Sequence, residues 1–406
     1  MSKRKIAIFT GNRSEYGLLL PVLKAVEKHP ELEYRLIVSG AHLDDHFGRT
    51  LQEIENDGIQ VHAEALINMD AQAPYATARA IGSGIMSISH ALYNLRPDIM
   101  VAFADRLESF AAVISASQMN IPTAHIEGGD LTEGGTLDDS VRHAMTKLSH
   151  LHFTSNQQAT NRILAMGEEE WRIHTVGFTA LDLINNGMYA DAQKVSEYFQ
   201  LDTCRPIIVF TQHPVSTDYQ AAPAQIEQSL NALVTLADQG MQIIITYPNN
   251  DIGSDSIVSG LVVLEKKKIK GIQIHKSIGR YLYHGILGLA KNINHRIACA
   301  GNSSSGIMES IAFGCPTVNI GSRQRGRLRG NNILDVDYSG MAIINAINAC
   351  IYDEKFRKQC REAVNPYFSG GAGTKIANVL ASITLDHNLL NKRMMLRGEI
   401  NDGWYR

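Results

Sequence analysis

The sequence predicts an α/β protein with two doubly wound parallel sheets that face each other across a cleft. Short apolar, β-branched runs alternate with longer amphipathic stretches, and this pattern restarts after a polar segment around 185–194. A chain of 406 residues is also too long for one comfortable hydrophobic core. We therefore expect a first domain at 1–180, a second at 200–368, and a final segment, 369–406, with a helix that returns to the first domain and a tail.

The strands are predicted from nearly uninterrupted apolar runs, which are typical of parallel sheets covered on both faces. In the first half the predicted strands are Lys5–Thr10, Tyr34–Ser39, Ile99–Ala104, Thr123–Ile126, His152–Thr154 and His174–Val176. In the second half they are Ile207–Thr211, Gln242–Thr246, Gly271–Ile274, Arg296–Ala300 and Thr317–Ile320.

Composition narrows the class of protein. Hydrophobic residues make up 44% of the chain and charged residues 19%, and the net charge of −3 argues against a nucleic-acid partner. The five cysteines form no C-x-x-C pair, which fits reduced thiols in the cytosol. The apolar run Ile6–Phe9 is too short for a signal peptide, and no run approaches membrane-spanning length. We expect a cytoplasmic protein with no membrane partner.

Residues 298–311 predict a strand, a Gly/Ser turn and a helix that contains Glu309. Free backbone N–H groups and the helix dipole at such a turn favour a phosphate or diphosphate, and Glu309 lies close enough to accept from a sugar diol. An ordinary serine-capped helix explains this stretch equally well by itself. Polar residues also follow six other predicted strands, at the edge where doubly wound sheets bind ligands, and this weakens the ordinary interpretation.

These strand ends, read in order, resemble the hydrolysing branch of the UDP-N-acetylglucosamine 2-epimerase family. The matching segments are G-N-R-S-E-Y-G at 11–17, S-G-A-H-L at 39–43, F-G-R-T at 47–50, A-D-R-L-E at 104–108, H-I-E-G-G-D at 125–130, T-L-D-D-S-V-R-H at 136–143, T-Q-H-P-V-S-T-D at 211–218, Y-P-N-N-D-I-G-S at 247–254, G-N-S-S-S-G at 301–306 and S-R-Q-R-G-R at 322–327. Non-hydrolysing members resemble one another in T-x-H-R-x-E-N, where this chain has Thr211-Gln212-His213-Pro214-Val215, and usually begin with G-T-R-P-E, where it has G-N-R-S-E.

The resemblance implies a glycosyltransferase-B-like pair of Rossmann-like domains and a hydrolysing 2-epimerase. UDP leaves carbon 1 of UDP-N-acetylglucosamine as carbon 2 loses its proton, and water adds to the resulting glycal to give N-acetylmannosamine for sialic-type (nonulosonic) acids. The implied catalytic residues are Asp105, Glu127, Asp138 and His213. The implied UDP-binding residues are Arg13, Arg106, His125, Asn249, Ser303, Ser304, Glu309 and Arg323. Crowding of the acids should raise at least one carboxyl pKa.

The resemblance implies no cofactor, and no His, Asp or Glu cluster has a recognisable metal-ligand spacing. A homodimer or homotetramer is expected. The run from Arg323 to Arg329 extends the predicted anion site, although Arg327 and Arg329 are expected to lie in a solvated loop.

Three alternatives remain open. The same reaction on UDP-2,4-diacetamido-2,4,6-trideoxyglucose, in the legionaminic acid pathway, would use the same scaffold and acids. A glycosyltransferase of the same architecture would need an acceptor site but not three acids and a histidine. A non-catalytic sensor of nucleotide sugars would keep the UDP contacts and dispense with the acids.

Overall fold

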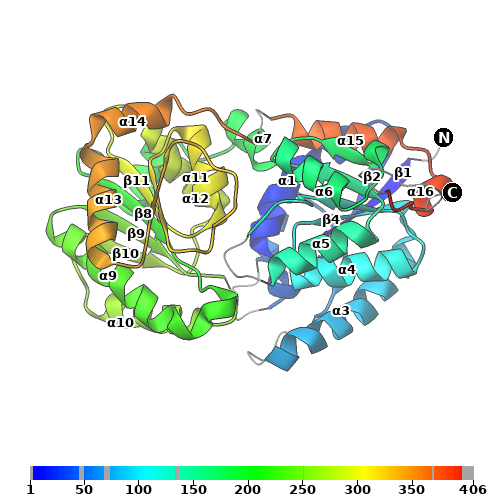
Figure 1. Ribbon diagram of the computed structural model, residues 1–406, viewed down its shortest axis with the longest axis horizontal. Helices are drawn as coiled ribbons and strands as arrows, with labels where there is room; N and C mark the ends of the chain where they lie inside the picture. The colour runs from blue at the N-terminus through cyan, green and yellow to red at the C-terminus, as the bar shows by residue number, and fades with distance from the viewer. Residues whose placement is uncertain are drawn as a thin grey trace, which may run out of the picture. The chain divides into compact units, whose positions relative to one another are not determined.

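The computed structural model describes residues 3–44, 50–67, 74–132, 137–249, 251–367 and 370–395. The chain divides into two compact units, each built around one parallel sheet with helices interleaved between strands (Figure 1). This arrangement confirms the predicted α/β fold class. The first unit comprises Met1–Asp130, Asp138–Asp182 and Gly370–Arg406, and the second comprises Leu131–Leu137 and Leu183–Ser369.

In the described residues the first unit has a seven-stranded sheet in the order β3-β2-β1-β4-β5-β6-β7, and its neighbouring strands all pair in parallel. The strand order reverses between β1 and β4, which is the switch point of a doubly wound sheet. The strands are β1 Arg4–Thr10, β2 Leu32–Ser39, β3 Val61–Ala65, β4 Ile99–Phe103, β5 Thr123–Ile126, β6 Leu151–Thr154 and β7 Ile173–Thr175.

Helices cover both faces of this sheet (Figure 1). Ala7 and Phe9 of β1 pack into one core cluster with apolar residues of α3, α4 and α5, while the alternate residues Ile6 and Ile8 are also fully buried. Helix α15 packs against α1, and Gly373 lies close to the Pro21 carbonyl. The helices are α1 Arg13–Lys28, α2 Leu51–Asn56, α3 Pro74–Leu95, α4 Leu107–Gln118, α5 Asp138–Leu148, α6 Gln157–Ala165, α15 Ala372–Ser382 and α16 His387–Leu390.

The second unit has a six-stranded parallel sheet among its described residues, in the order β10-β9-β8-β11-β12-β13. This order repeats that of the first sheet, so the switch point lies between β8 and β11. The strands are β8 Ile207–Thr211, β9 Gln242–Thr246, β10 Ile272–His275, β11 Ile297–Gly301, β12 Thr317–Ile320 and β13 Ile333–Val336.

One face of the second sheet packs against α9, α10 and α13 in a single core cluster that includes Ile208, Phe210, Ala298 and Ala300. Helix α11 contacts α8 and β11, and α12 contacts β11 and β12. Helix α7, Ala180–Asn185, spans the boundary between the units. The remaining helices are α8 Ala192–Phe199, α9 Ala222–Asp238, α10 Ser254–Lys266, α11 Gly279–Gly288, α12 Ser304–Met308, α13 Gly340–Tyr352 and α14 Glu354–Arg361.

Segment Leu131–Leu137 departs from the predicted domain division, which placed it in the first domain. It groups with the second unit. The reason is visible at Thr132, which is buried and accepts a hydrogen bond from Arg327 Nη2 at 3.1 Å. A tertiary contact of this kind joins residues nearly two hundred positions apart, so composition along the chain does not reveal it.

Among the described residues, no helix is both long and apolar enough to span a membrane.

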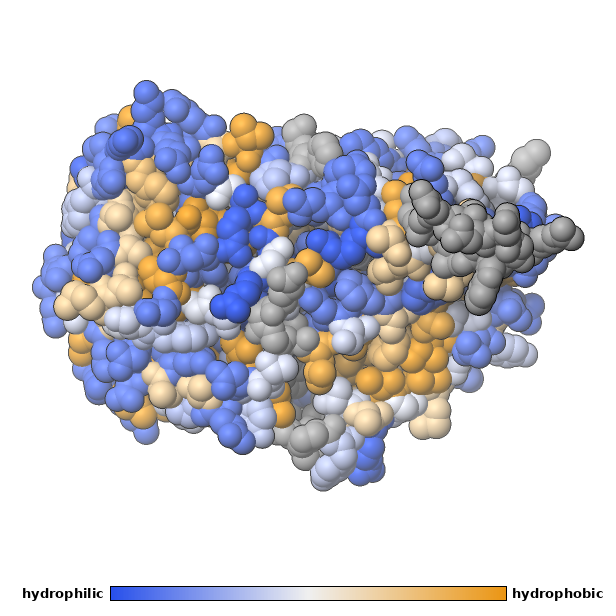
Figure 2. Space-filling view, in the orientation of Figure 1, coloured by the Kyte–Doolittle hydropathy of each residue, from blue (hydrophilic) through white to orange (hydrophobic). Residues whose placement is uncertain are grey.

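Apolar side chains gather over α3 and α4 on the face that Figure 2 shows. On α3, Met86 and Tyr93 are 71% and 65% exposed. The structure contains one chain, and the expected homodimer or homotetramer stays a prediction.

Candidate active site

Ligands of doubly wound sheets bind beyond the carboxyl ends of the strands, near the switch point. Each of the two units has a group of polar residues at that place. In the first unit they lie after β1, β4 and β5 and at the start of α5. In the second unit they follow β8, β9, β11 and β12.

Arg142 of α5 organises the first group. Its guanidinium forms an ion pair with Asp105, which follows β4, and its Nη1 donates to the backbone carbonyl of Glu127 at 3.2 Å. Arg142 is 1% exposed, and the Asp105 side chain is 15% exposed. Asp138 begins the same helix four residues before Arg142, which places both on one helix face. Arg142 thus links the loops that carry the three predicted acids.

Sequence reasoning missed Arg142. The signal that reveals it is its place one helical turn after Asp138 within the T-L-D-D-S-V-R-H segment. A buried arginine needs a carboxylate partner, and Asp105 supplies it.

The turns after β4 and β5 have unusual backbone conformations. Ala104 has φ 54° and Glu127 has φ 62°, so two residues with side chains lie in the left-handed region. Such conformations cost energy and persist where the surroundings impose them, often at functional sites. Here the backbone N–H of Ala104 donates to Ile126 and that of Glu127 donates to Phe153, both at 2.9 Å. These bonds continue the sheet hydrogen bonding past the ends of β4 and β5 and so fix the backbone positions of Asp105 and Glu127.

His125, which was predicted to contact UDP, supports the turn after β4 in the structure, and its UDP contact stays a prediction. It is fully buried, its Nε2–H donates to the Ala104 carbonyl at 2.7 Å, and its Nδ1 lies 3.1 Å from Thr146 Oγ1. Burial lowers the pKa of His125 to about 3, so the ring is neutral. Both ring nitrogens are therefore engaged inside the first unit, and we assign His125 to positioning the Asp105 turn.

A carboxyl pair missed by sequence reasoning lies at the first switch point. Glu15 of α1 accepts from the Gly11 N–H at 2.9 Å and from Ser109 Oγ at 3.0 Å, and Glu108 of α4 is fully buried beside it. Burial, and next the charge of Glu108, raise the pKa of Glu15 to about 7. A side chain at Gly11 would place its Cβ 2.5 Å from that of Glu108. The close pair therefore requires glycine there.

Arg106, one of the two predicted arginines of the first unit, lies close to this pair. Arg106 Nε lies 3.7 Å from Glu108 Oε2, so part of its charge faces the buried carboxylate. Helix α1 begins at Arg13, but the Arg13 side chain lies outside the described residues and its predicted contact stays a prediction.

Asn302 is the centre of the second group, and sequence reasoning missed it. Its Oδ1 accepts from the His213 N–H at 2.6 Å, and its Nδ2 donates to the His213 carbonyl at 2.9 Å. His213 Nδ1 in turn accepts from the backbone N–H of Asn249 at 3.1 Å. A neutral His213 therefore has its proton on Nε2. Asn249 contributes through its backbone, and its predicted UDP contact stays a prediction.

The turn after β11 differs from its prediction. Helix α12 has only five residues, so its dipole is weaker than that of the longer helix expected, and Glu309 forms its C-cap with φ −102° instead of lying inside it. Ser303 is the N-cap and Ser304 the first helical residue. Gly301 has φ 123°, and a Cβ there would lie 1.9 Å from the Thr211 carbonyl oxygen. Glycine at this position lets β8 and β11 approach at the switch point.

Arg323 completes the second group. Its Nη1 donates to the Asn302 carbonyl at 3.3 Å, and its Nη2 lies 3.6 Å from Asp251 Oδ2. The prediction of a solvated loop is wrong for Arg327, which is 8% exposed and donates to Met308 Sδ and Thr132 Oγ1. Arg327 is thus part of the packing beneath the turn, whereas Arg325 of the same run is exposed.

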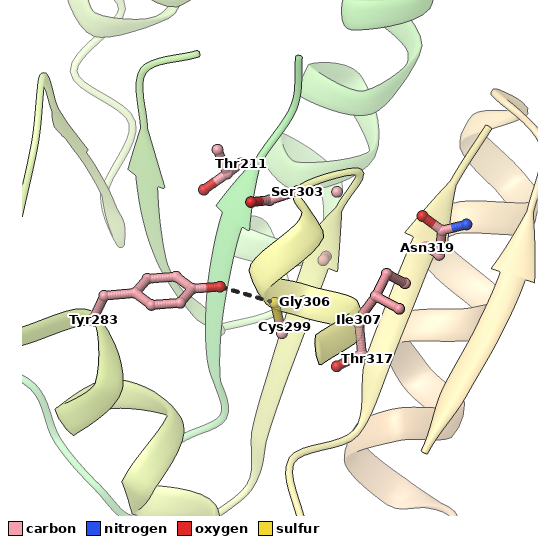
Figure 3. A pocket seen from close by; sticks show the side chains of 10 residues that line it. Thr211, Tyr283, Cys299, Ser303, Gly306, Ile307, Thr317 and Asn319 are labelled. Carbon is pink, nitrogen blue, oxygen red and sulfur yellow. Dashed lines mark hydrogen bonds between the residues drawn. The ribbon is translucent and has the colours of Figure 1, made fainter. Parts of the chain in front are cut away.

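A small pocket lies beside this turn, and Figure 3 shows Tyr283, Cys299 and Ser303 among the residues around it. Among the described residues, no group of three or more His, Cys, Asp or Glu side chains is arranged to hold a metal ion. The absence of a cofactor stays a prediction.

Two open sheets of the same strand order, with polar groups at both switch points, define a glycosyltransferase-B-like α/β protein. The chain belongs to the UDP-N-acetylglucosamine 2-epimerase family, whose pattern matches residues 24–381. It is 35% identical to a UDP-N-acetylglucosamine 2-epimerase of Neisseria meningitidis serogroup B, over 86% of this chain and 88% of that protein. It is 31% identical to a hydrolysing UDP-N,N'-diacetylbacillosamine 2-epimerase of Legionella pneumophila, over 96% and 98%.

Solved structures share the fold. A UDP-GlcNAc 2-epimerase from Neisseria meningitidis bound to UDP-GlcNAc has a TM-score of 0.77 at 17% identity, covering 93% of this chain and 99% of that one. A Methanocaldococcus jannaschii enzyme in complex with UDP-GlcNAc and UDP has a TM-score of 0.74 at 19% identity, covering 93% and 99%. At these identities the likeness bears on the fold alone.

Proposed function

We propose that this chain hydrolyses UDP-N-acetylglucosamine with inversion at carbon 2, releasing UDP and free N-acetylmannosamine for sialic-type acid biosynthesis. The observation that carries the hydrolytic assignment is Gln212-His213-Pro214 directly after β8, where the non-hydrolysing members have a different motif. The names of the hydrolysing relatives support it. A polysialic acid biosynthesis protein of Escherichia coli that is 29% identical over 91% of each chain supports the sialic-type product.

The second unit is proposed to hold the nucleotide. Ser303, Ser304 and the backbone of their turn would donate to the diphosphate, and Arg323 would offset its charge with charge-assisted hydrogen bonds. Glu309 would accept from the ribose diol. His213, with its proton on Nε2, is suited to donate to the diphosphate as its negative charge grows.

The first unit is proposed to perform the chemistry. The bond between carbon 1 and the diphosphate oxygen breaks and UDP departs with the electron pair, while a carboxylate takes the proton from carbon 2. Water then adds its oxygen to carbon 1 and gives up one proton to a carboxylate, while a carboxyl group returns a proton to the opposite face of carbon 2. Asp105, Glu127 and Asp138 are the proposed acid and base groups. Negative charge also stabilises the oxocarbenium-like transition state.

A second substrate has support of its own. Two relatives, 31% and 32% identical, are named as hydrolysing epimerases of N,N'-diacetylbacillosamine nucleotides. UDP-2,4-diacetamido-2,4,6-trideoxyglucose differs from the first substrate only at carbons 4 and 6, so the same acids would act on it.

The test is incubation with each UDP-sugar in heavy water, with NMR of the products. We expect free sugar with deuterium at carbon 2 and one UDP per sugar, without an acceptor and in the presence of a chelator. A product that remains linked to the nucleotide contradicts hydrolysis, and retention of the original hydrogen contradicts the glycal. UDP release that requires an added acceptor would indicate a glycosyltransferase.

A further inference from the structure

Two consecutive residues of α11 contact the proposed nucleotide site. Tyr283 contacts the serine-rich turn, and His284 contacts Glu309. His284 is 1% exposed, and its Nε2 lies 2.7 Å from Glu309 Oε2. The Tyr283 hydroxyl accepts from Ser305 Oγ at 2.9 Å, and Ser305 Oγ lies 2.9 Å from Ser303 Oγ. The two side chains therefore reach the two halves of the proposed nucleotide site separately.

His284 holds one oxygen of Glu309 in place. The ring of His284 lies 5.7 Å from that of Phe313, which limits its rotation. Glu309 Oε1 has no hydrogen-bond partner among the described residues, and the Glu309 side chain is 12% exposed. One carboxylate oxygen is thus fixed from within the unit while the other is left to accept from a ligand. A diol such as that of ribose is the ligand that suits a carboxylate oriented in this way.

Tyr283 holds the serine hydroxyls by a chain of hydrogen bonds. Its hydroxyl also lies 3.6 Å from Cys299 Sγ, the contact drawn as a dashed line in Figure 3. Burial raises the pKa of the Cys299 thiol to about 11, so this sulfur is uncharged at neutral pH. The chain from Cys299 through Tyr283 and Ser305 to Ser303 restricts the direction of the Ser303 hydroxyl.

Helix α11 is a rigid support for both side chains. A Cβ at Gly285 would lie 2.6 Å from Val195 Cγ2 of α8 and 2.7 Å from the Ala190 carbonyl oxygen. Only glycine allows this close packing, and it adjoins His284 directly. Because α11 has no room to shift here, its side chains keep their reach to the turn and to Glu309.

We propose that His284 and Tyr283 are positioning residues that set ribose and diphosphate recognition separately. His284 orients Glu309 toward the ribose diol, and Tyr283 orients Ser303 toward a phosphate oxygen. The inference rests on the proposed function, in which the second unit binds UDP. Both residues are proposed to act through Glu309 and Ser303 and not by direct contact with the nucleotide.

Calorimetric titration with three probes, UDP, 2′-deoxy-UDP and uridine, tests the role of His284 and the role of Tyr283 separately. In wild type, the preference for UDP over 2′-deoxy-UDP should be about tenfold or more, since a hydrogen bond to a charged group is lost. His284→Leu should reduce that preference to about threefold or less with little change in affinity for 2′-deoxy-UDP. His284→Gln, whose amide nitrogen can reach the position of Nε2, should restore much of it, whereas the shorter His284→Asn should not.

Tyr283→Phe should leave the ribose preference intact and reduce the preference for UDP over uridine by about threefold to tenfold. A residue with only a packing role would weaken all three probes alike. If His284→Leu fails to fold, the Gln and Asn variants decide the ribose arm, because both are polar and differ mainly in reach.

The outcomes distinguish a failure of the proposed function from a failure of the two positioning roles. A wild-type protein that does not bind UDP refutes the proposed function. Binding of UDP with a ribose preference that is the same in His284→Leu, His284→Asn and wild type overturns the role of His284 alone. A UDP-to-uridine preference unchanged in Tyr283→Phe overturns the role of Tyr283 alone.

Discussion

The same position in the two sheets has opposite chemistry. At the switch point of the first sheet, between β1 and β4, the buried carboxyl groups of Glu15 and Glu108 lie side by side, and Ala104 and Glu127 adopt left-handed backbone conformations nearby. At the switch point of the second sheet, between β8 and β11, the neutral amide of Asn302 holds both backbone groups of His213. The first site is centred on buried carboxyl groups and has left-handed backbone conformations, while the second is centred on a neutral amide and is closely hydrogen-bonded.

This difference indicates a division of labour. Buried carboxyl groups with raised pKa values are suited to proton transfer near neutral pH. A preorganised set of hydrogen-bond donors that includes an arginine is suited to binding an anion without a change in its own charge. The following predictions test whether chemistry belongs to the first unit and nucleotide binding to the second.

The largest effect is expected for Asp105→Asn, which keeps the shape of the side chain and removes its charge. Turnover should fall by about two to four orders of magnitude while the dissociation constant of UDP changes by less than about threefold. Steady-state kinetics and calorimetry measure the two quantities. Asp238→Asn, the same change on an exposed residue of α9, is the control and should alter neither. A loss of UDP affinity equal to the loss of turnover would place Asp105 in binding.

Arg142→Met should have the next largest effect. It leaves the mostly buried Asp105 carboxylate without its ion-pair partner, which typically costs about 3–5 kcal/mol of unfolding free energy. Turnover should fall by about tenfold to a hundredfold, because the turns that carry Asp105 and Glu127 lose their common anchor. Urea unfolding and kinetics are the measurements. Arg142→Lys keeps the charge but not the two-pronged geometry, so it should be intermediate; a variant as stable and active as wild type contradicts the role of Arg142.

Asn302→Ala tests the second sheet. Loss of the amide leaves the buried N–H and carbonyl of His213 without that partner, at about 1–3 kcal/mol. UDP affinity should fall by about tenfold, and turnover of bound substrate should fall less. Asn302→Asp keeps the acceptor for the His213 N–H and loses the donor, so it provides a matched comparison. Unchanged UDP affinity with a large loss of turnover would reverse the proposed division between the sheets.

The smallest effect concerns pH and the Glu15–Glu108 pair. The pKa of Glu15 is raised from 4.5 to about 7 in the folded protein, so the native state binds its proton more tightly than the unfolded chain does. The free energy of unfolding should therefore fall as pH rises through that interval and level off above it. Besides Glu108, the charged group nearby is Arg106. Glu15→Gln should flatten the dependence, measured by urea unfolding at several pH values; an identical slope in the variant contradicts the raised pKa.

Two of the four edge strands, β3 and β13, mark the limit of the predicted fold. The central strands of both sheets were predicted because strands such as Ile99–Phe103 are fully buried and apolar throughout. The edge strands β3 and β13, Val61–Ala65 and Ile333–Val336, were not predicted. They are only partly buried and contain Glu64 and Asp335, so they lack the continuous apolar run that indicates a buried strand.

The candidate site residues were predicted from motifs, but the residues that hold them in place were not predicted. Arg142 and Asn302 act through partners 37 and 89 residues away in the sequence. His125 was predicted to contact UDP from the resemblance of its motif, and that contact stays a prediction. Its burial in β5, with both ring nitrogens engaged, places it as a support of the turn after β4. A motif shows which residue types are present, and only the fold shows which way each one faces.

The sequence by itself determined two parallel α/β sheets, because apolar strands buried on both faces leave a local pattern, and it indicated the family through motifs at the strand ends. The tertiary structure decided how those motifs are held. The raised pKa of Glu15 arises from burial beside Glu108, the tautomer of His213 from the Asn249 backbone, and the orientation of Glu309 from His284. Each of these depends on distances between elements that are remote in the chain, and the electrostatics and hydrogen bonds of the site follow from those distances.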